Sequence, residues 1–409
     1  MKGCHLLNET TLKKRDPTMT QLRSFEIPTV MKHGLGSISY LADEVKALGL
    51  KRPLVVTDPG IVQAGLLDRA ITILQAANLE YAIFDRVAPN PPIALIDDGA
   101  DLYRREKCDG IIGLGGGSAM DTAKSIGVIA SNGGSILDYE WAEPQPIKQR
   151  IPPTICIPTT AGTGSEVTLW AVVTDPQRKI KFNVGGTALI GAWVALIDPE
   201  LTLELPPAVT AGTGMDALAH AVECYTCAYA QPMSDSVALL AMEYVSDYLR
   251  VAFAQGHNAE ARYKMSMAAM LGGLAYGKES AGAAQAMSQS AGGVHDVPHG
   301  ALTARLLGPV MEYNYLGEPH KFARIAQALG EDTRGLSVWQ AAEKAVEAVM
   351  RLTEEVEIPS LPTLGFTEEE IPMLAEIAFN DPQTIGNPRD LSRDSYVKIY
   401  RRAFELGMS

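Results

Sequence analysis

One stretch organises the rest of this chain, and it reads Gly113-Leu114-Gly115-Gly116-Gly117-Ser118-Ala119-Met120-Asp121-Thr122-Ala123-Lys124. It follows an apolar run at residues 110–112 and leads into a helical pattern, which predicts a strand, a glycine turn and a helix N-terminus. Successive glycines let the backbone approach a bulky anion, and the free N–H groups of a first helical turn bind phosphate. We therefore expect a phosphate-binding turn. The alternative is that the glycines only pack the strand closely against the helix.

The spacing of these glycines matches neither of two common phosphate-binding patterns. The chain lacks the Gly-x-Gly-x-x-Gly of a Rossmann turn at this place, and no Gly-Lys-Ser/Thr of a P-loop follows. Ser118 can cap the expected helix, and Asp121 favours its start. Other motifs of the chain are therefore needed to decide whether the turn binds a phosphate.

The composition is that of an ordinary globular protein. The chain has 409 residues, of which 46% are hydrophobic and 20% charged, and its formal net charge is -13. This acidic balance disfavours a nucleic-acid surface. No apolar run approaches the ~20 residues that cross a bilayer, and the N-terminus has no apolar signal core. We expect a cytoplasmic protein of two domains, with no nucleic-acid or membrane partner.

Strand and helix patterns alternate along the first half of the chain and then stop. Residues 1–23 are polar and without periodicity, which predicts a flexible N-terminal extension. Residues 24–204 alternate strand-like runs, the first at residues 25–30, with helical patterns, one of which covers residues 61–77. This alternation predicts an α/β domain with a parallel sheet and flanking helices. Residues 205–409 show mainly helical periodicity and are predicted to form an all-helical domain.

Three positions fall where predicted strands end. Asp58 follows the apolar residues 53–57, Asn90 comes after the next strand, and Gly115 begins the glycine turn. Ligands of parallel sheets bind beyond the carboxyl ends of the strands. We therefore expect these three residues to border one binding site.

A second group of polar residues lies in the helical part. Asp216 and His220 are four residues apart on one helix face, where a carboxylate oxygen and an imidazole nitrogen can reach one divalent cation. The same spacing also suits a plain hydrogen bond. His299 lies between a proline and a glycine, where a loop can direct its imidazole into a cleft, and His295 is close by.

Several stretches together resemble the iron-dependent, group III alcohol dehydrogenase family. They cover the chain from about Ser24 onward, and they read Gly115-Gly116-Gly117-Ser118-x-x-Asp121-x-Ala123-Lys124, Pro158-Thr159-Thr160-Ala161-Gly162-Thr163-Gly164-Ser165-Glu166-Val167-Thr168, Asp198-Pro199-Glu200-Leu201-Thr202, Gly214-Met215-Asp216-Ala217-Leu218-x-His220-Ala221-x-Glu223, Pro298-His299-Gly300 and Asn387-Pro388-Arg389. The resemblance implies a dehydroquinate synthase-like fold. An α/β dinucleotide-binding domain would precede an all-helical metal and substrate domain, with NAD(P) and metal in the cleft between them.

The resemblance assigns cofactor contacts to the glycine turn and its surroundings. Gly116, Gly117 and Ser118 would hold the pyrophosphate, and Asp58 would face the adenosine ribose. A carboxylate there accepts hydrogen bonds from a 2′-hydroxyl and repels a 2′-phosphate, so NAD(H) is expected over NADP(H). The remaining cofactor-binding candidates are Gly115, Asp121, Asn90, Thr159, Thr160, Thr168 and Lys181.

The same resemblance implies a divalent metal, Fe²⁺ or Zn²⁺, but the chain departs from the family at two positions. Asp216, His220 and His299 match three metal ligands. The fourth ligand is a histidine in the family and Gln285 here, and a second family histidine, near the nicotinamide, is Gln289 here. An amide oxygen is a poorer ligand than imidazole, and an amide cannot act as a general acid near neutral pH.

Three explanations of this departure are open. Gln285 ligates weakly through its carbonyl oxygen, which is the explanation the sequence favours. Alternatively the metal is absent, as in the related maleylacetate reductases, and hydrogen bonds from Gln285, His220 and His299 hold the substrate oxygen. In the third explanation His295 supplies the missing imidazole. The catalytic candidates are therefore Gln289 and His295.

The function implied is that of an NAD(H)-dependent oxidoreductase, interconverting a small polar aldehyde and its primary alcohol, with the carbonyl polarised by a divalent metal. A polar pocket wall of Gln285, Gln289, Tyr276 and His295 suits a small polar or anionic aldehyde better than a long alkyl one. The alternatives are a metal-independent reductase of the same fold and a nucleotide-binding paralogue without turnover. The family resemblance also implies a homodimer or larger homo-oligomer.

Overall fold

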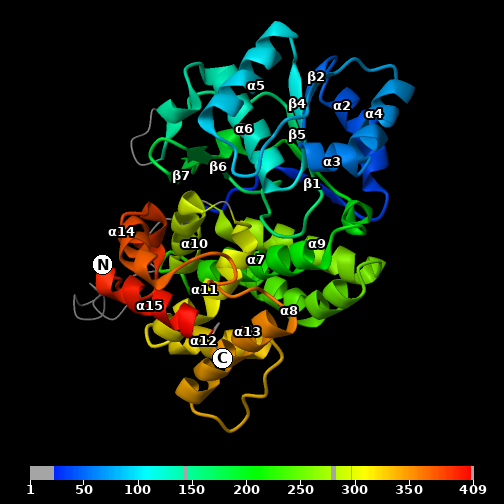
Figure 1. Ribbon diagram of the computed structural model, residues 1–409. Helices are drawn as coiled ribbons and strands as arrows, with labels where there is room; N and C mark the ends of the chain where they lie inside the picture. The colour runs from blue at the N-terminus through cyan, green and yellow to red at the C-terminus, as the bar shows by residue number, and fades with distance from the viewer. Residues whose placement is uncertain (1–22, 142–145, 278–281, 296, 407–409) are drawn as a thin grey trace, which may run out of the picture.

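The computed structural model describes residues 23–141, 146–277, 282–295 and 297–406 (Figure 1). The predicted N-terminal extension lies outside these ranges except for Arg23, whose guanidinium donates to the carbonyl of Ala230 at 2.8 Å. The described chain forms a sheet with helices on both faces and, below it in Figure 1, a separate layer of helices.

A six-stranded sheet is the centre of the first part, and all of its strands are parallel. The strand order across it is β1-β8-β5-β4-β2-β3. Its middle strands are buried along their whole length, because the apolar runs of the sequence are covered on both faces. The bounds are β1 Val30–His33, β2 Pro53–Val56, β3 Ala82–Phe84, β4 Gly110–Gly115, β5 Thr154–Pro158 and β8 Val194–Ile197.

Helices cover both faces of this sheet (Figure 1). On one face α5 (Ile93–Arg105) packs against α6 (Gly117–Asn132), which follows the glycine turn directly. On the other face, α2 (Leu41–Ala47) and α4 (Leu66–Ala76) pack together next to α3 (Pro59–Gln63). The two faces have their own buried apolar clusters, which hold α6 and thus the glycine turn rigidly on the sheet.

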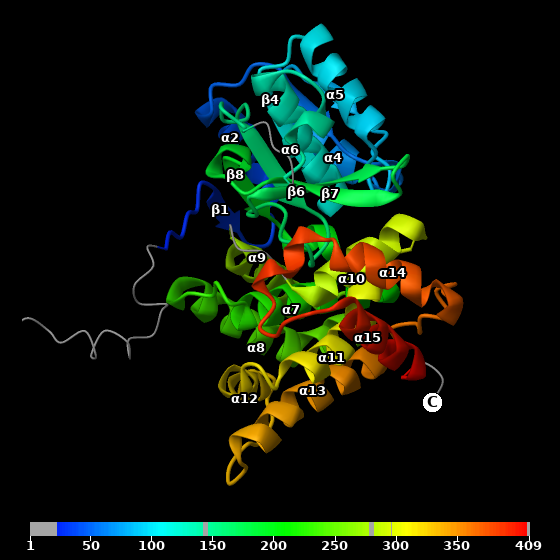
Figure 2. The same ribbon diagram turned by 90° about the vertical axis from the view of Figure 1, so that its left-hand side faces the viewer.

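A two-stranded antiparallel ribbon, β6 (Trp170–Asp175) and β7 (Ile180–Gly185), was not predicted from the sequence. Figure 2 shows it at the lower side of the α/β part, facing the helices. Strand β7 contacts α10 of the helical part, and β6 contacts α6. The ribbon therefore forms a wall between the two parts of the chain.

The second part is helical, as predicted. Its long helices share one large buried cluster in which α7, α8 and α9 pack against one another and α11 packs against α7. The bounds are α7 Pro207–Thr226, α8 Pro232–Ala254, α9 Ala259–Tyr276, α10 Ala283–Val294, α11 His299–Asn314, α12 Pro319–Ala328, α13 Val338–Glu355, α14 Ile371–Phe379 and α15 Arg393–Glu405, and the short 3-10 helices include η5 Pro199–Thr202, η6 Glu368–Glu370 and η7 Pro382–Gly386.

The fold class predicted from the sequence is confirmed, and two local predictions are wrong. The first strand lies at Val30–His33 rather than at residues 25–30. The helix expected over residues 61–77 is divided into α3 and α4, because Gly65 takes a left-handed conformation at φ 73° between them. The predicted domain division at residue 204 falls between η5 and α7, and it stays a prediction. Among the described residues no helix is long and apolar enough to span a membrane.

Candidate active site

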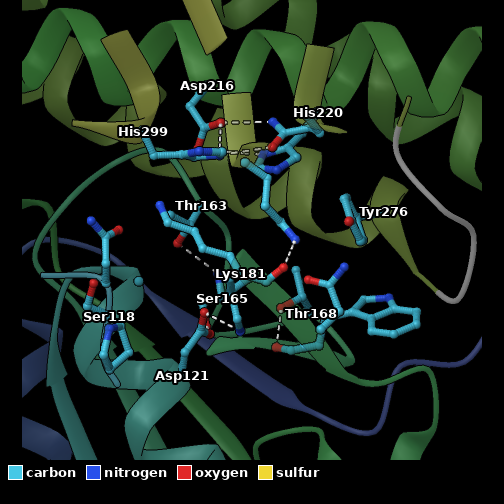
Figure 3. Close-up of a pocket in the computed structure, with 18 of the residues that line it drawn as sticks. Ser118, Asp121, Thr163, Ser165, Thr168, Lys181, Asp216, His220, Tyr276 and His299 are labelled. Atoms are coloured by element: carbon cyan, nitrogen blue, oxygen red, sulfur yellow. Dashed lines mark hydrogen bonds and ion pairs between the residues drawn. The ribbon is translucent and has the colours of Figure 1, made fainter. Parts of the chain in front are cut away.

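A pocket lies between the glycine turn and the helical part (Figure 3). Eleven of the residues predicted for the site line it together, five from the helical part and six from the α/β part. They are Asn90, Gly117, Ser118, Asp121, Thr168, Lys181, Asp216, His220, Gln285, Gln289 and His299. The structure thus brings together the two polar groups that lie about a hundred residues apart in the sequence.

The glycine turn exposes backbone to this pocket because side chains would not fit in it. Gly115 ends β4 at φ 149°, and a Cβ there would lie 2.7 Å from the Cβ of Ala119. A Cβ on Gly117 would lie 2.7 Å from Cγ2 of Thr163. Gly116 is the N-cap of α6, so the predicted cap by Ser118 is wrong, and no side chain caps this end of the helix with a hydrogen bond. The first N–H groups of α6 therefore face the pocket, where an anion is stabilised.

Other predicted cofactor residues border the turn without lining the pocket. Asp58 is the N-cap of α3 and accepts hydrogen bonds from the N–H groups of Gly60 and Ile61 at 2.9 and 3.1 Å. Its second carboxylate oxygen lies beside Gly115. The backbone N–H of Thr159 donates to the carbonyl of Gly115 at 3.0 Å, and the side chain of Thr160 lies against Gly116.

Asp121 and Lys124 fasten the threonine-rich loop, residues 159–168, to α6. The ammonium of Lys124 is fully buried and donates to the carbonyl of Ser165 at 2.9 Å, to Oγ1 of Thr168 at 3.2 Å and to the carbonyl of Trp170. Asp121 lies 3.3 Å from that ammonium and accepts hydrogen bonds from the hydroxyl of Ser165 at 2.5 Å and from a β6 backbone N–H at 3.0 Å. Asp121 lines the pocket, but its oxygens hold the pocket wall in place.

The helical side of the pocket brings Asp216, His220, His299 and Gln285 together from α7, α10 and α11. Nδ1 of His220 is 4.0 Å from Oδ2 of Asp216, and Nε2 of His299 is 3.7 Å from Oδ1 of Asp216. The side chain of Gln285 lies between Asp216 and His299. It donates to Oδ1 of Asp216 at 3.0 Å, and its Oε1 is 2.9 Å from Nε2 of His299. Figure 3 shows Asp216, His220 and His299 directed at one another above Lys181 and Ser165.

Burial decides the charge of the groups around this cluster. Burial lowers the pKa of His299 to about 4, although the Asp216 carboxylate opposes the shift, so its imidazole is neutral near neutral pH. Burial raises the pKa of Glu223 to about 7, against three backbone hydrogen bonds that favour its charged form. These come from the N–H groups of Gly282, Ala284 and Gln285 at 3.2, 2.6 and 3.1 Å. Glu223 therefore fixes the N-terminal turn of α10, which carries Gln285.

Gln289 belongs to a chain of hydrogen bonds across the back of the pocket. The hydroxyl of Tyr276 donates to Oε1 of Gln383 at 2.8 Å, and Nε2 of Gln383 donates to Oε1 of Gln289 at 3.1 Å. Nε2 of Gln289 then donates to the carbonyl of Lys181 on β7 at 3.0 Å. Both ends of the Gln289 amide are engaged, so this residue joins α10 to β7 and to η7, and its catalytic role stays a prediction.

His295 is not brought to the pocket. Its Nε2 lies 2.7 Å from a carboxylate oxygen of Glu370, and its ring lies against Phe366 with centroids 4.5 Å apart. It does not line the pocket, so the structure gives no support to His295 as the missing imidazole or as a catalytic group.

The side chains present do not fit the metal centre that the resemblance implies. Weak ligation by Gln285 requires its Oε1 to face the ion together with Asp216, but this oxygen faces His299. Within the described residues, no group of three or more His, Cys, Asp or Glu has an arrangement that could hold a metal ion. A neutral amide is also a weaker donor for Fe²⁺ or Zn²⁺ than imidazole. The nitrogen Nδ1 of His220 is buried, and none of the described residues makes a hydrogen bond with it.

Several lining residues were not predicted as site residues. Thr163 and Ser165 belong to the loop already identified by its glycines and hydroxyls, so the signal for them was present. Trp170 and Asn183 come from the unpredicted ribbon of β6 and β7. Gln383 comes from η7, where the sequence carries no motif that points to a site.

The fold and the pocket define a class of protein, in which a phosphate-binding turn faces polar groups held by a helical layer. Residues 28–199 match the family described as iron-containing alcohol dehydrogenase, and residues 210–404 match the C-terminal part of the Fe-containing alcohol dehydrogenase family. The chain therefore belongs to the iron-containing alcohol dehydrogenase family, and it is an oxidoreductase that acts on small alcohols or aldehydes.

Individual relatives are similar over nearly the whole chain. A choline dehydrogenase of Bacillus subtilis is 53% identical over 397 residues, covering 97% of this chain and 98% of the relative. An NAD-dependent methanol dehydrogenase of Bacillus methanolicus is 37% identical over 383 residues, covering 93% and 100%. A crystal structure of 1,3-propanediol oxidoreductase superposes with a TM-score of 0.90 at 39% identity, covering 94% of this chain and 100% of that one.

Proposed function

We propose that this protein is an NAD(H)-dependent dehydrogenase that interconverts a small polar primary alcohol and its aldehyde. The observation that carries the proposal is the shared pocket, in which the exposed N–H groups of α6 face Asp216, His220 and His299. A dinucleotide whose pyrophosphate lies on that helix end extends toward these side chains. When bound, NAD⁺ accepts the hydride that leaves the alcohol carbon.

The side chains around the turn support NAD(H) over NADP(H). Asp58 is half-buried at the carboxyl end of β2, and two backbone N–H groups orient its carboxylate. A carboxylate in this position accepts hydrogen bonds from the ribose 2′-hydroxyl and repels a 2′-phosphate. The Bacillus methanolicus relative is named as NAD-dependent, which agrees with this preference.

We propose choline, or a similar small amino alcohol, as the first substrate to test. The relative with 53% identity is named a choline dehydrogenase. The pocket of this chain presents the aromatic rings of Trp170 and Tyr276 and the carboxylate of Asp216. Aromatic faces attract quaternary ammonium groups, and a nearby carboxylate adds to that attraction. Choline is a small polar substrate, as the sequence predicts. It is a cation, however, and not the anionic aldehyde that the sequence also allows.

Different residues around the pocket bind and orient the cofactor and the substrate. Lys124 and Asp121 fix the loop that carries Thr163 and Thr168 along one side of the pocket. The chain from Tyr276 to Lys181 closes the back of the pocket and helps to exclude water. The imidazole of His220, beside Asp216 and His299, presents the polar atom that meets the hydroxyl or carbonyl oxygen. A divalent metal at these three residues is implied by the resemblance, but Gln285 does not fit it, so the proposal has no step through a metal.

The assay that tests this function measures NADH formation by purified protein with choline, ethanol and methanol, together with a fluorescence titration of NADH. We expect NADH binding and a kcat/KM for choline at least about tenfold above that for ethanol. NADH binding without oxidation of any alcohol would indicate the paralogue without turnover. No NADH binding at all would reject the proposal.

The assembly and location predicted from the sequence also belong to this proposal. We propose a homodimer or larger homo-oligomer in the cytoplasm. Light scattering of the purified full chain measures its mass in solution, and a mass of one chain would contradict the dimer.

A further inference from the structure

The amide of Gln285 joins two residues that match metal ligands of the family. It donates to Oδ1 of Asp216 at 3.0 Å, and its Oε1 lies 2.9 Å from Nε2 of His299. Asp216 and Gln285 are only 2% and 4% exposed, so water does not compete for these bonds. The atoms that would face a metal ion are therefore already bound to one amide.

The chemistry of the neighbours fixes the direction of this amide. An ionised carboxylate only accepts hydrogen bonds, so Asp216 requires the NH₂ end of Gln285. The reverse orientation would place Oε1 of the buried Gln285 against a buried carboxylate oxygen, which is costly because two acceptors would face each other. With Oε1 directed at His299, Nε2 of His299 carries the proton and donates it. That nitrogen then has no lone pair for a metal.

The side chain of Glu223 holds the first turn of α10, the helix that carries Gln285, in place. Glu223 accepts hydrogen bonds from the backbone N–H groups of Gly282, Ala284 and Gln285 itself. The backbone of Gln285 is thus fixed within the first turn of α10, and its side chain reaches Asp216 and His299 from a rigid element. The amide bridge is a built feature of the pocket rather than a chance contact of a mobile side chain.

We propose that Gln285 takes the place of the metal ion in this protein, so that the site works without Fe²⁺ or Zn²⁺. The amide donates to Asp216 and accepts from His299, whereas a cation would need a lone pair from both residues. The substrate oxygen is then held by hydrogen bonds from the pocket side chains. The inference rests on the proposed function, because it concerns the same site. Its test measures the metal content of the protein, which does not depend on turnover.

The experiment compares metal binding by the full-length wild type with Gln285→His, which carries the imidazole of the family. Both proteins are produced with added iron and zinc, analysed for metal, stripped with chelator and titrated with Co²⁺ while its absorption is recorded. We expect far less than one metal per wild-type chain. Gln285→His should bind Co²⁺ about 100-fold more tightly than the wild type, because one ligand is restored and the bridge is removed.

Gln289→His is the matched control, since it makes the same change one helical turn away. Gln289 touches neither Asp216 nor His299 but bonds to Lys181 and Gln383, so this variant should gain no Co²⁺ affinity. Circular dichroism of each stripped variant shows whether it is folded, and Gln285→Asn, which is one methylene shorter, serves as a second probe. It should lose the bridge without gaining a strong ligand.

Each result supports or overturns the inference. Wild-type protein with one firmly bound metal per chain would overturn it, and so would wild-type activity that a chelator removes and Fe²⁺ or Zn²⁺ restores. A folded Gln285→His protein that gains no affinity would also overturn it, because Gln285 would then not be what excludes the metal. Metal-free wild type without turnover would leave the inference standing while the proposed function fails.

Discussion

The two sides of the pocket are built in different ways. On the α/β side, backbone and glycines form the binding surface, and the side chains that matter, such as Asp121 and Lys124, hold that surface in place. On the helical side, individual side chains form the surface, and they include Gln285 and Gln289, where the resemblance implies histidines. The comparison teaches that the binding surface on the α/β side depends on backbone conformation, whereas the chemistry on the helical side depends on single side chains.

The largest effect that tests this comparison is expected at Gly117. In Gly117→Val the side chain would meet Thr163, because even a Cβ would lie 2.7 Å from its Cγ2, and it would enter the space over the helix end. We expect NADH to bind about 100-fold more weakly, or roughly 2.7 kcal/mol. Fluorescence titration measures this loss. Gly116→Ala is the control, since its Cβ would lie 3.4 Å from Oγ1 of Thr160, and it should lose less than about tenfold.

A second prediction concerns Glu166, which is buried in the loop next to the turn. Burial raises its pKa to about 7, so the folded protein holds a proton there that the unfolded chain releases near pH 4.5. This carboxyl therefore favours the folded state fully below pH 4.5, and that contribution falls as the pH rises to about 7. Glu166→Gln should be more stable than the wild type at pH 8 by about 2 kcal/mol, with little difference at pH 4.5.

Urea unfolding at the two pH values measures this difference. Glu368→Gln, at an exposed position on η6, controls for the loss of a surface carboxylate. Equal free energies of unfolding for Glu166→Gln and the wild type at pH 8 would show that the burial of Glu166 carries no cost.

A third and smaller effect is expected at Asp58, on the α/β side. Asp58→Asn keeps a side-chain oxygen for the N–H groups of Gly60 and Ile61 but removes the charge. We expect the ratio of NADH to NADPH affinity to fall about tenfold, because the repulsion of the 2′-phosphate is lost. Binding of the two cofactors is compared by titration. An unchanged ratio would place the adenosine ribose elsewhere.

The smallest effect is expected at Tyr276, on the helical side. Tyr276→Leu removes the ring that would face a quaternary ammonium group, and KM for choline should rise about fivefold, or roughly 1 kcal/mol. Tyr276→Phe keeps the ring and loses only the hydrogen bond to Gln383. KM for the carbon isostere of choline, which has no charge, should change little in either variant. A similar rise for charged and uncharged alcohols would indicate a loss of shape rather than of a cation–π contact.

The sequence predicted the parts of the molecule that depend on local pattern. Apolar runs between helical patterns gave the parallel sheet, and the glycines marked the turn before α6, because both signals lie within a few residues. The ribbon of β6 and β7 was missed, since its strands are buried against α6 and α10 and depend on distant contacts.

The roles of individual side chains in the pocket were harder to predict from the sequence than the sheet and the glycine turn. His295 looked like a substitute for the missing histidine, but its loop directs it to Glu370, 75 residues away. The pairing of Gln285 with both Asp216 and His299 depends on the crossing of α7, α10 and α11, which no local pattern specifies. Sequence distance therefore limited the prediction of the site more than residue type did.

The chain of hydrogen bonds from Tyr276 through Gln383 and Gln289 to Lys181 has a consequence for synthesis on the ribosome. One of its members, Gln383, comes from η7, which follows the helices that carry Tyr276 and Gln289 in the chain. The back of the pocket cannot close until the ribosome has synthesised the chain beyond Gln383 and that segment has left the exit tunnel. Nascent chains that terminate before Gln383 should hold a complete parallel sheet and an open, non-functional cleft.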